Sequence, residues 1–427
     1  MSNSQQAILQ ELVHFVRKNS LYYAEQYASV DATSPLQLTD LPVIHSETFW
    51  SFNTVDGNRL LTSAIIDGGI WASGGTTSMP KVSYYTRDEL RRLVQAADIG
   101  MLRAGLLPGD RIANLFYAGD LYMGFVLFSL CLQELSIPNV LLPISGNITS
   151  DSAATHIVDL QATVILTNTT NITRVTSAMI EKGLIAERVR LILFAGEAFY
   201  PDLYPLVHRA FPNATIGPLQ FSSVDAGMIG LPVKEAPPGS DGIDAVYVAN
   251  KPSVIVEILN DDDKPITEPG IPGRIVITDL TRRLQPVIRY PMGDVGEWVD
   301  YKEEIFRPRG RDSVGVKIGT TMELPMLRAA VAKTIGDRSL GLFQVVVRRV
   351  DGKNEMIFRL VKDQDEPKDH DAVAKELQRN LEEIRPQFKK HVADGIVHPL
   401  RVEWVTVKEL HFNARTGKLK DIIDERY

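Results

Sequence analysis

Short apolar stretches alternate with helical stretches between residues 86 and 221, and this order limits the fold more than any other feature of the chain. The apolar stretches have the length and composition of buried strands, and they span residues 111–117, 139–143, 162–167, 189–194 and 215–221. A helix pattern runs from Thr86 to Leu107, with Asp88 and Glu89 in its first turn. Alternation of this kind predicts an α/β domain with a largely parallel sheet.

The sequence on either side of this region follows other patterns. Residues 7–18 carry apolar side chains at helical spacing, which predicts an amphipathic helix. Residues 254–259 and 274–278 predict a hairpin with a long polar turn between them. That turn contains three aspartates, at positions 261–263, but they lack the twelve-residue spacing of a calcium loop. A solvated turn is therefore the better interpretation.

The pattern of elements starts again after Gly310-Arg311-Asp312. We predict, in chain order, a helix at 322–335, strands at 342–350 and 355–361, a long helix at 371–392 and a final strand at 401–407. Asp351-Gly352 is typical of the tight turn that joins two such strands. The sequence thus predicts a large N-terminal domain, residues 1–310, and a small α+β C-terminal domain, residues 311–427.

Composition supports this reading and excludes several classes of protein. A chain of 427 residues is longer than a single core usually accommodates. Its net charge of -7 argues against a nucleic-acid-binding surface, which needs a basic stripe. The single cysteine, Cys131, lies in an apolar stretch, so we expect a buried thiol and no disulfide. There is no signal-peptide pattern and no apolar run of about 20 residues, so we expect a cytoplasmic protein with no membrane partner.

The most distinctive local motif is Trp71-Ala-Ser-Gly-Gly-Thr-Thr-Ser-Met-Pro-Lys81. Glycines allow backbone N–H groups to converge on phosphate oxygens, hydroxyls add donors, and a lysine supplies positive charge. The motif is not a Walker sequence, because Gly-Lys-Ser/Thr is missing. By itself it is equally consistent with a phosphate cradle and with an ordinary flexible turn.

Residues 73–81 resemble the phosphate-binding loop of the adenylate-forming superfamily, which includes acyl-CoA synthetases, adenylation domains and luciferases. That loop usually reads Ser-Gly-Thr-Thr-Gly, any residue, Pro-Lys. The residues that this chain shares with it are Gly75, Thr76, Thr77, Pro80 and Lys81. Gly74 and Ser78 stand where the family usually has serine and glycine, and both remain small.

Further stretches resemble other motifs of the family, in the family's order. These stretches are residues 105–110, 195–198, 221–225, 285–294, 310–312 and 415–418. The matches extend over nearly the whole chain. The run Pro-Val-Ile-Arg-Tyr at 286–290 is similar to the phenylacetate–CoA ligase branch, which includes relatives from phenazine-type antibiotic biosynthesis.

The resemblance implies a role for each matched residue. Phosphate binding is implied for Ser73, Gly74, Gly75, Thr76, Thr77, Ser78 and Lys81. The implied adenine and acid site contains Gly196, Glu197, Ala198, Phe221, Ser222 and Ser223. Asp294 would bind the ribose, Arg311 the ribose or a phosphate, and Lys418 would be a mobile catalytic lysine. The implied cofactors are ATP and Mg²⁺, with coenzyme A as a further co-substrate.

The magnesium position departs from the family pattern. The family usually has threonine and then glutamate there, whereas this chain has Val224 and Asp225. Aspartate still ligates Mg²⁺, but its reach is shorter by one methylene. A nucleotide-binding regulatory protein without activity therefore remains an alternative, as does an acyltransferase that uses no ATP. Retention of Lys81, Asp294, Arg311 and Lys418 favours an active enzyme.

The reaction that the resemblance implies has two halves. A carboxylate, aromatic to judge from the residues at 116–119, would attack the α-phosphate of ATP to give an acyl-AMP and pyrophosphate. The small domain would then rotate about Asp312, and the acyl group would pass to an acceptor. Coenzyme A, the phosphopantetheine of a carrier protein acting in trans, and an amine are all open as acceptors. A homodimer is also left open.

Overall fold

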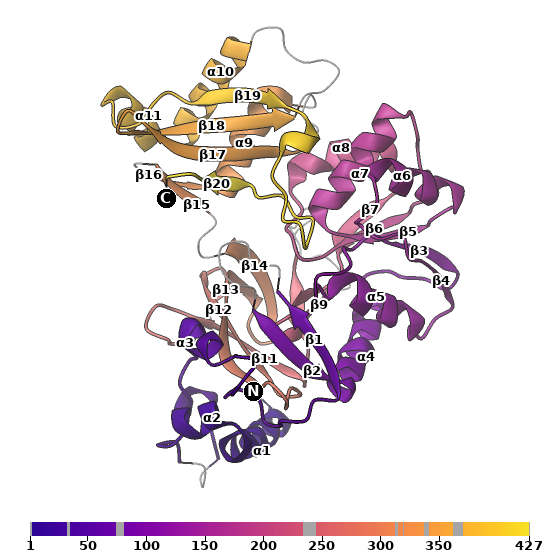
Figure 1. The fold of residues 1–427 in the computed structure, drawn as a ribbon, viewed down its shortest axis with the longest axis vertical. Coiled ribbons are helices and arrows are strands. Elements are labelled where there is room, and N and C mark those ends of the chain that lie inside the picture. The colour runs from indigo at the N-terminus through magenta and orange to yellow at the C-terminus, as the bar shows by residue number, and fades with distance from the viewer. Residues whose placement is uncertain are drawn as a thin grey trace.

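The computed structural model describes residues 2–31, 35–73, 81–233, 245–311, 315–318, 320–336, 341–361 and 370–426 (Figure 1). One sheet has five strands in the order β4-β3-β5-β6-β7, and all of its strands are parallel. The strands are β3 (Asp110–Asn114), β4 (Asn139–Leu142), β5 (Val164–Thr167), β6 (Leu191–Phe194) and β7 (Thr215–Pro218). The connecting helices are α5 (Gly124–Gln133), α6 (Ser150–Asp159), α7 (Thr169–Glu181) and α8 (Tyr204–Ala210). The predicted α/β architecture is confirmed.

A seven-stranded antiparallel sheet lies next to the parallel one, in the order β11-β12-β13-β14-β10-β9-β8. Its strands are β8 (Phe221–Ser223), β9 (Gly227–Pro232), β10 (Tyr247–Ala249), β11 (Val254–Leu259), β12 (Gly273–Asp279), β13 (Val287–Asp300) and β14 (Ile305–Arg311). The predicted hairpin is β11 paired with β12. The strand predicted at 215–221 is wrong as one element: β7 ends at Pro218, which has no N–H for the ladder, and β8 joins the other sheet.

The N-terminal helices cover the antiparallel sheet (Figure 1). They are α1 (Asn3–Asn19), α2 (Leu21–Gln26) and α3 (Ser46–Ser51). Leu9, Leu12 and Val16 of α1 are fully buried in one cluster with Ile255 and Ile277 of the sheet. Burial of each such side chain stabilises the fold by about 1.5–3 kcal/mol. The amphipathic helix predicted at 7–18 is thus present, and it begins earlier because Ser2 forms a capping box with Gln5.

A two-stranded ribbon, β1 (Gly68–Ala72) and β2 (Val82–Thr86), leads into α4 (Arg87–Arg103). Thr86 is the N-cap of α4, and it forms a capping box with Glu89, so the predicted helix start is confirmed. The helix ends before the predicted residue 107 because Gly105 has a φ of 103°. The glycine-rich motif joins β1 to β2, so these strands fix both ends of it.

The C-terminal part has its own core. A four-stranded sheet, in the order β19-β18-β17-β20, packs with α9 (Leu324–Ile335) and α10 (His370–Ile384) around Leu327, Val345, Phe358 and Leu377. The strands of this sheet are β17 (Phe343–Val350), β18 (Lys353–Val361), β19 (Arg401–Val405) and β20 (Ile422–Asp424). A small ribbon, β15 (Gly315–Ile318) and β16 (Thr320–Glu323), precedes α9.

The C-terminal part corrects three predictions. The helix expected at 371–392 is two helices, α10 and α11 (Pro386–Ala393), because Pro386 cannot donate to the preceding turn. The strand at 401–405 is not the last one, since β20 follows it and pairs in parallel with β17. The first two residues of the helix predicted at 322–335 belong to β16. The predicted hinge residue Asp312 lies outside the described residues.

Within the described ranges, no helix is both long enough and apolar enough to cross a lipid bilayer. Cys131 is buried in α5, as expected, and burial raises the pKa of its thiol to about 12. A thiol with so high a pKa is a poor nucleophile at neutral pH.

Candidate active site

Lys418 is presented by a tight hairpin between β19 and β20. Within it, Asn413 N–H donates to the Lys418 carbonyl at 2.8 Å, and Gly417 N–H donates to the Asn413 carbonyl at 2.8 Å. The hairpin reaches from the C-terminal part to the parallel sheet (Figure 1). There the Lys418 ammonium donates to the carbonyl of Gly196, which follows the carboxyl end of β6. Two of the predicted site residues, far apart in sequence, are therefore in contact.

Gly417 adopts a φ of 65°, and its Cα lies against the ring of Tyr117. A Cβ at this position would be 1.8 Å from Tyr117 Cζ, so only glycine fits here. Next to it, Arg415 forms an ion pair with Asp120 at 2.9 Å. Tyr117 and Asp120 follow β3, so the carboxyl ends of two strands of the parallel sheet, β3 and β6, receive the hairpin.

Glu197 is turned away from open solvent. Its carboxylate accepts hydrogen bonds from Thr170 N–H at 2.7 Å and from the Thr170 hydroxyl at 2.9 Å. Burial raises the pKa of Glu197, and the positive charge of Lys418 opposes that rise. Glu197 thus supports the first turn of α7, while the exposed Gly196 contacts Lys418 and Ala198 is exposed two residues further on.

The two described ends of the glycine-rich motif are bonded to each other. Ser73 N–H donates to the Lys81 carbonyl at 2.8 Å, and Lys81 N–H donates to the Ser73 hydroxyl at 3.1 Å. The predicted phosphate-binding residues Gly74, Gly75, Thr76, Thr77 and Ser78 lie outside the described residues. Arg415 of the hairpin donates to the Ser73 carbonyl at 3.5 Å. The base of the motif and the lysine hairpin are therefore neighbours.

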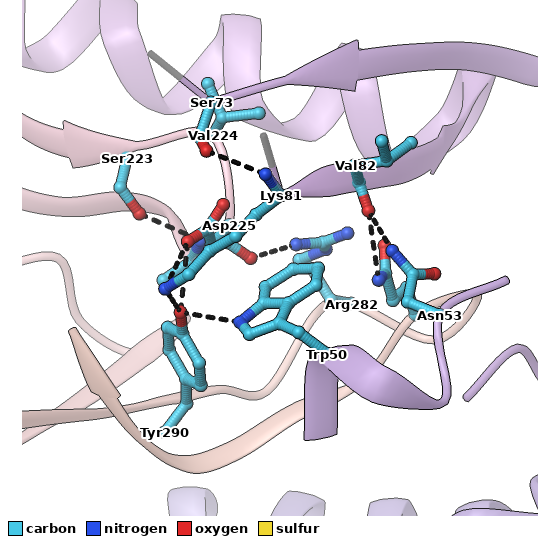
Figure 2. A network of polar contacts seen from close by, with 12 residues as sticks. Trp50, Asn53, Ser73, Lys81, Val82, Ser223, Val224, Asp225, Arg282 and Tyr290 are labelled. Atoms are coloured by element: carbon cyan, nitrogen blue, oxygen red, sulfur yellow. Dashed lines mark hydrogen bonds and ion pairs between the residues drawn. The ribbon is translucent and has the colours of Figure 1, made fainter. Parts of the chain in front are cut away.

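Lys81, Asp225, Tyr290 and Trp50 form a closed polar network (Figure 2). Lys81 Nζ lies 3.6 Å from Asp225 Oδ2 and 2.6 Å from the Tyr290 hydroxyl, which in turn donates to Asp225 Oδ2 at 3.0 Å. Trp50 Nε1 donates to the Tyr290 hydroxyl at 3.1 Å. Burial raises the pKa of Asp225, and the Lys81 charge opposes this.

Asp225 provides one oxygen that fits a cation. Its Oδ1 is buried and has no hydrogen-bond partner, whereas Oδ2 is held by Tyr290 and Lys81. Among the described residues no three acidic, histidine or cysteine side chains cluster as a complete metal site. Mg²⁺ commonly takes only one or two protein carboxylates when substrate phosphates complete its shell. The residues present therefore fit a magnesium ion that is bound together with a nucleotide.

Phe221, Ser222 and Ser223 form β8 and are half-buried. The Phe221 ring centroid lies 5.5 Å from that of Tyr247 and 5.6 Å from that of Phe306. Ser222 accepts from Gln220 Nε2 at 3.2 Å, and Ser223 accepts from Ala226 N–H at 3.0 Å. An aromatic cluster therefore supports Phe221 from the side of the antiparallel sheet.

Asp294 and Arg311, the predicted ribose-binding pair, are cross-strand neighbours. The antiparallel pairing of β13 with β14 sets Asp294 directly opposite Arg311 along the backbone. They are 17 positions apart in the sequence (311 − 294), and the sheet register explains their proximity. The two motifs thus meet at one place on the antiparallel sheet.

The sequence matches no protein-family model and no curated protein. Solved structures match over nearly the whole chain. One is 2-hydroxyisobutyryl-CoA ligase in the postadenylation state in complex with 2-HIB-AMP, with a TM-score of 0.78, 16% identity, and coverage of 99% of this chain and 89% of that chain. A second is AtGH3.15 acyl acid amido synthetase in complex with 2,4-DB, with a TM-score of 0.72, 13% identity, and coverage of 98% and 91%.

The fold is that of the adenylate-forming enzymes. At these identities the likeness concerns the fold, and it confirms the resemblance at that level. The extent of the likeness differs between two structures of one neighbour. The same CoA ligase in the thioesterification state matches with a TM-score of 0.63, at 17% identity and with 99% and 89% coverage. The backbone of this chain is thus more similar to the postadenylation structure of that ligase than to its thioesterification structure.

Several residues of this site carried no signal in the sequence. Trp50 and Tyr290 are separated by 240 positions, and Trp50 belongs to a short helix with no motif around it. Asn168 and Thr170, at the start of α7, belong to none of the matched motifs. Tyr290 was part of a recognised run, but only the structure shows its hydroxyl beside Lys81 and Asp225.

Proposed function

We propose that this protein uses ATP to convert a carboxylic acid into its acyl-AMP, with release of pyrophosphate. The position of Lys418 carries the proposal: its ammonium is docked at the carboxyl end of the parallel sheet, beside Gly196. A fixed positive charge there stabilises the negative charge that accumulates on an α-phosphate during in-line attack. The adenylate-forming fold and its closer likeness to a postadenylation structure support the same reaction.

The other site residues would each bind a different part of ATP. Ser73 and Lys81 close the base of the glycine-rich motif, whose residues would bind the β- and γ-phosphates. Asp294 and Arg311 would hold the ribose, and Phe221 would lie against the adenine. Holding the acid and the nucleotide on one frame removes much of the entropic barrier to their reaction.

Asp225 would hold the magnesium ion through its unpartnered Oδ1. A bound Mg²⁺ supplies positive charge to the phosphate oxygens. Tyr290 and Lys81 keep the carboxylate in place through its second oxygen, Oδ2. Aspartate in place of glutamate is therefore compatible with an active enzyme.

The acid and the acceptor belong to the same proposal. Tyr117 follows β3 and lies against the lysine hairpin, and its aromatic ring suits a flat aromatic acid. We propose transfer to a thiol, that of coenzyme A or of a carrier protein, as in the phenylacetate–CoA ligase branch. An amine is the second candidate acceptor, because an acyl acid amido synthetase matches the fold over 98% of this chain.

Exchange of labelled pyrophosphate into ATP tests this proposal across a panel of aryl and alkyl acids. We expect exchange that depends on one class of acid and on Mg²⁺, and that falls about 100-fold or more in Lys418→Ala. Lys420→Ala is the matched control, because this exposed lysine is two positions away in the same segment. Absence of exchange with every acid, despite ATP binding, would support the nucleotide-binding alternative and overturn the proposal.

A further inference from the structure

The backbone on both sides of Lys418 is held by two side chains at the start of α7. Asn168 Nδ2 donates to the carbonyl of Thr416 at 3.1 Å, and the Thr170 hydroxyl accepts from Leu419 N–H at 3.2 Å. Both hydrogen bonds are buried. Together they bracket Lys418, since one acts two residues before it and the other acts one residue after it.

Each of these side chains also has a second partner that fixes it in advance. Asn168 Oδ1 accepts from Asn171 N–H at 2.8 Å and so caps α7. The Thr170 hydroxyl donates to Glu197 Oε1 at 2.9 Å, which leaves its lone pairs for Leu419. The amide and the hydroxyl are therefore preoriented toward the hairpin. Such preorientation reduces the entropic cost of docking.

We infer that Asn168 and Thr170 are positioning residues that select the docked state of the lysine hairpin. They bind main-chain atoms of the hairpin and leave the ammonium of Lys418 free to contact Gly196. When the hairpin withdraws, both lose these partners, so their hydrogen bonds favour the docked arrangement alone. This inference rests on the proposed adenylation, in which Lys418 acts only while it is docked.

The substitution Asn168→Asp separates the two roles of this residue. A carboxylate oxygen still caps α7, where a negative charge is favourable, so helix stability is retained. The donor to Thr416 is lost, and an oxygen then faces that carbonyl. We expect the kcat of pyrophosphate exchange to fall about 10- to 100-fold, with the KM for ATP unchanged. Thr170→Val, which removes the hydroxyl, is expected to act in the same direction.

Two further measurements distinguish positioning from a general structural defect. In a Lys418→Ala background, Asn168→Asp should cause no further loss of exchange, because it acts through that lysine. Trypsin should cut after Arg415 faster in Asn168→Asp than in the unsubstituted protein, since the hairpin undocks more often. Asn213→Asp is the matched control: it removes an exposed amide donor to the Glu187 carbonyl and should change neither readout.

The results of these experiments distinguish the positioning role of Asn168 from the proposed adenylation activity. Unchanged cleavage after Arg415, or an equal loss of exchange with and without Lys418, would overturn the positioning role. Absence of exchange in the unsubstituted protein would defeat the proposed function, and the tryptic readout would still decide whether Asn168 docks the hairpin.

Discussion

Tyr290 is the residue on which the network around Lys81 depends. Its hydroxyl accepts from Lys81 at 2.6 Å and from Trp50 at 3.1 Å, and it donates to Asp225 at 3.0 Å. Burial disfavours the charged carboxylate of Asp225 and raises its pKa. Loss of the Tyr290 hydroxyl would remove a hydrogen bond that stabilises this charge.

Tyr290→Phe should therefore lower the free energy of unfolding by about 1–3 kcal/mol and raise the KM for ATP. Chemical denaturation and exchange kinetics measure these effects. Trp50→Phe is the milder comparison, since it removes one donor and keeps an aromatic ring beside Lys81. An equal effect of both substitutions would contradict the central role given to the Tyr290 hydroxyl.

Gly417 gives a second test at the scale of a residue. A methyl group in Gly417→Ala would collide with the Tyr117 ring, so the hairpin could not dock as described. We expect exchange to fall about 100-fold, as for other misplacements of a catalytic group by about 1 Å. Gly352→Ala has a similarly positive φ, 76°, but open space around it, so it reports the cost of backbone strain alone. Comparable losses in the two variants would rule out the collision.

At the scale of elements, α4 is tied to the antiparallel sheet through one carboxylate. Glu89 completes the capping box with Thr86, and its Oε1 accepts from Arg283 N–H at 2.6 Å and Leu284 N–H at 2.9 Å. Thr86→Ala removes a cap and should cost about 1 kcal/mol. Glu89→Ala also leaves two backbone donors without a partner, so we expect a larger loss, about 2–4 kcal/mol, in equilibrium denaturation. The reverse order of these losses would show that Glu89 does not link the two elements.

The elements that the sequence predicted well are those with local signals. The start of α4 follows from Thr86 and Glu89, and the hairpin β17–β18 follows from Asp351-Gly352, both of which have positive φ. The break at Pro386 also had a local signal, but the apolar periodicity continued through it and suggested one helix. The division of 215–221 between two sheets depends on long-range packing, which local patterns do not report.

The candidate site also contains residues that the sequence indicates and residues that only long-range contacts reveal. Motif resemblance singled out Lys418, Gly196, Lys81 and Asp225, and the structure brings the first pair and the second pair into contact. The supporting residues Trp50, Asn168 and Thr170 contact partners some 240 to 250 positions away, so no pattern in the sequence could indicate them.

At the scale of the whole molecule, the C-terminal part meets the rest of the chain through charged groups as well as through the hairpin. Arg328 of α9 pairs with Asp202 at 2.7 Å, and Asp421 lies close to Arg328 and Glu197. Burial raises the pKa of Asp421 from 3.8 to about 7; Glu197 adds to this rise and Arg328 opposes it. We retain the division into residues 1–310 and 311–427 as a prediction.

The raised pKa of Asp421 determines how the stability of the folded protein changes with pH. The folded state favours the protonated acid, so stability contributed here is present below pH 3.8 and is lost as pH rises to about 7. Asp421→Asn should therefore raise the thermal midpoint at pH 7.5 more than at pH 5. Asp424→Asn is the control, because hydrogen bonding to Arg426 lowers the pKa of Asp424 and it does not titrate in this window. Equal shifts of the Asp421→Asn midpoint at both pH values would refute the assignment.

The central claim is that a carboxylate oxygen attacks the α-phosphate of ATP, and isotope transfer tests it most directly. The protein is incubated with ATP, Mg²⁺, an acid labelled with ¹⁸O in its carboxylate, and hydroxylamine, which takes the acyl group by attack at carbon. Mass spectrometry then locates the label. We predict AMP that carries one ¹⁸O atom, together with pyrophosphate and the hydroxamate. Label in inorganic phosphate with formation of ADP, or no labelled nucleotide with any acid, would contradict the account.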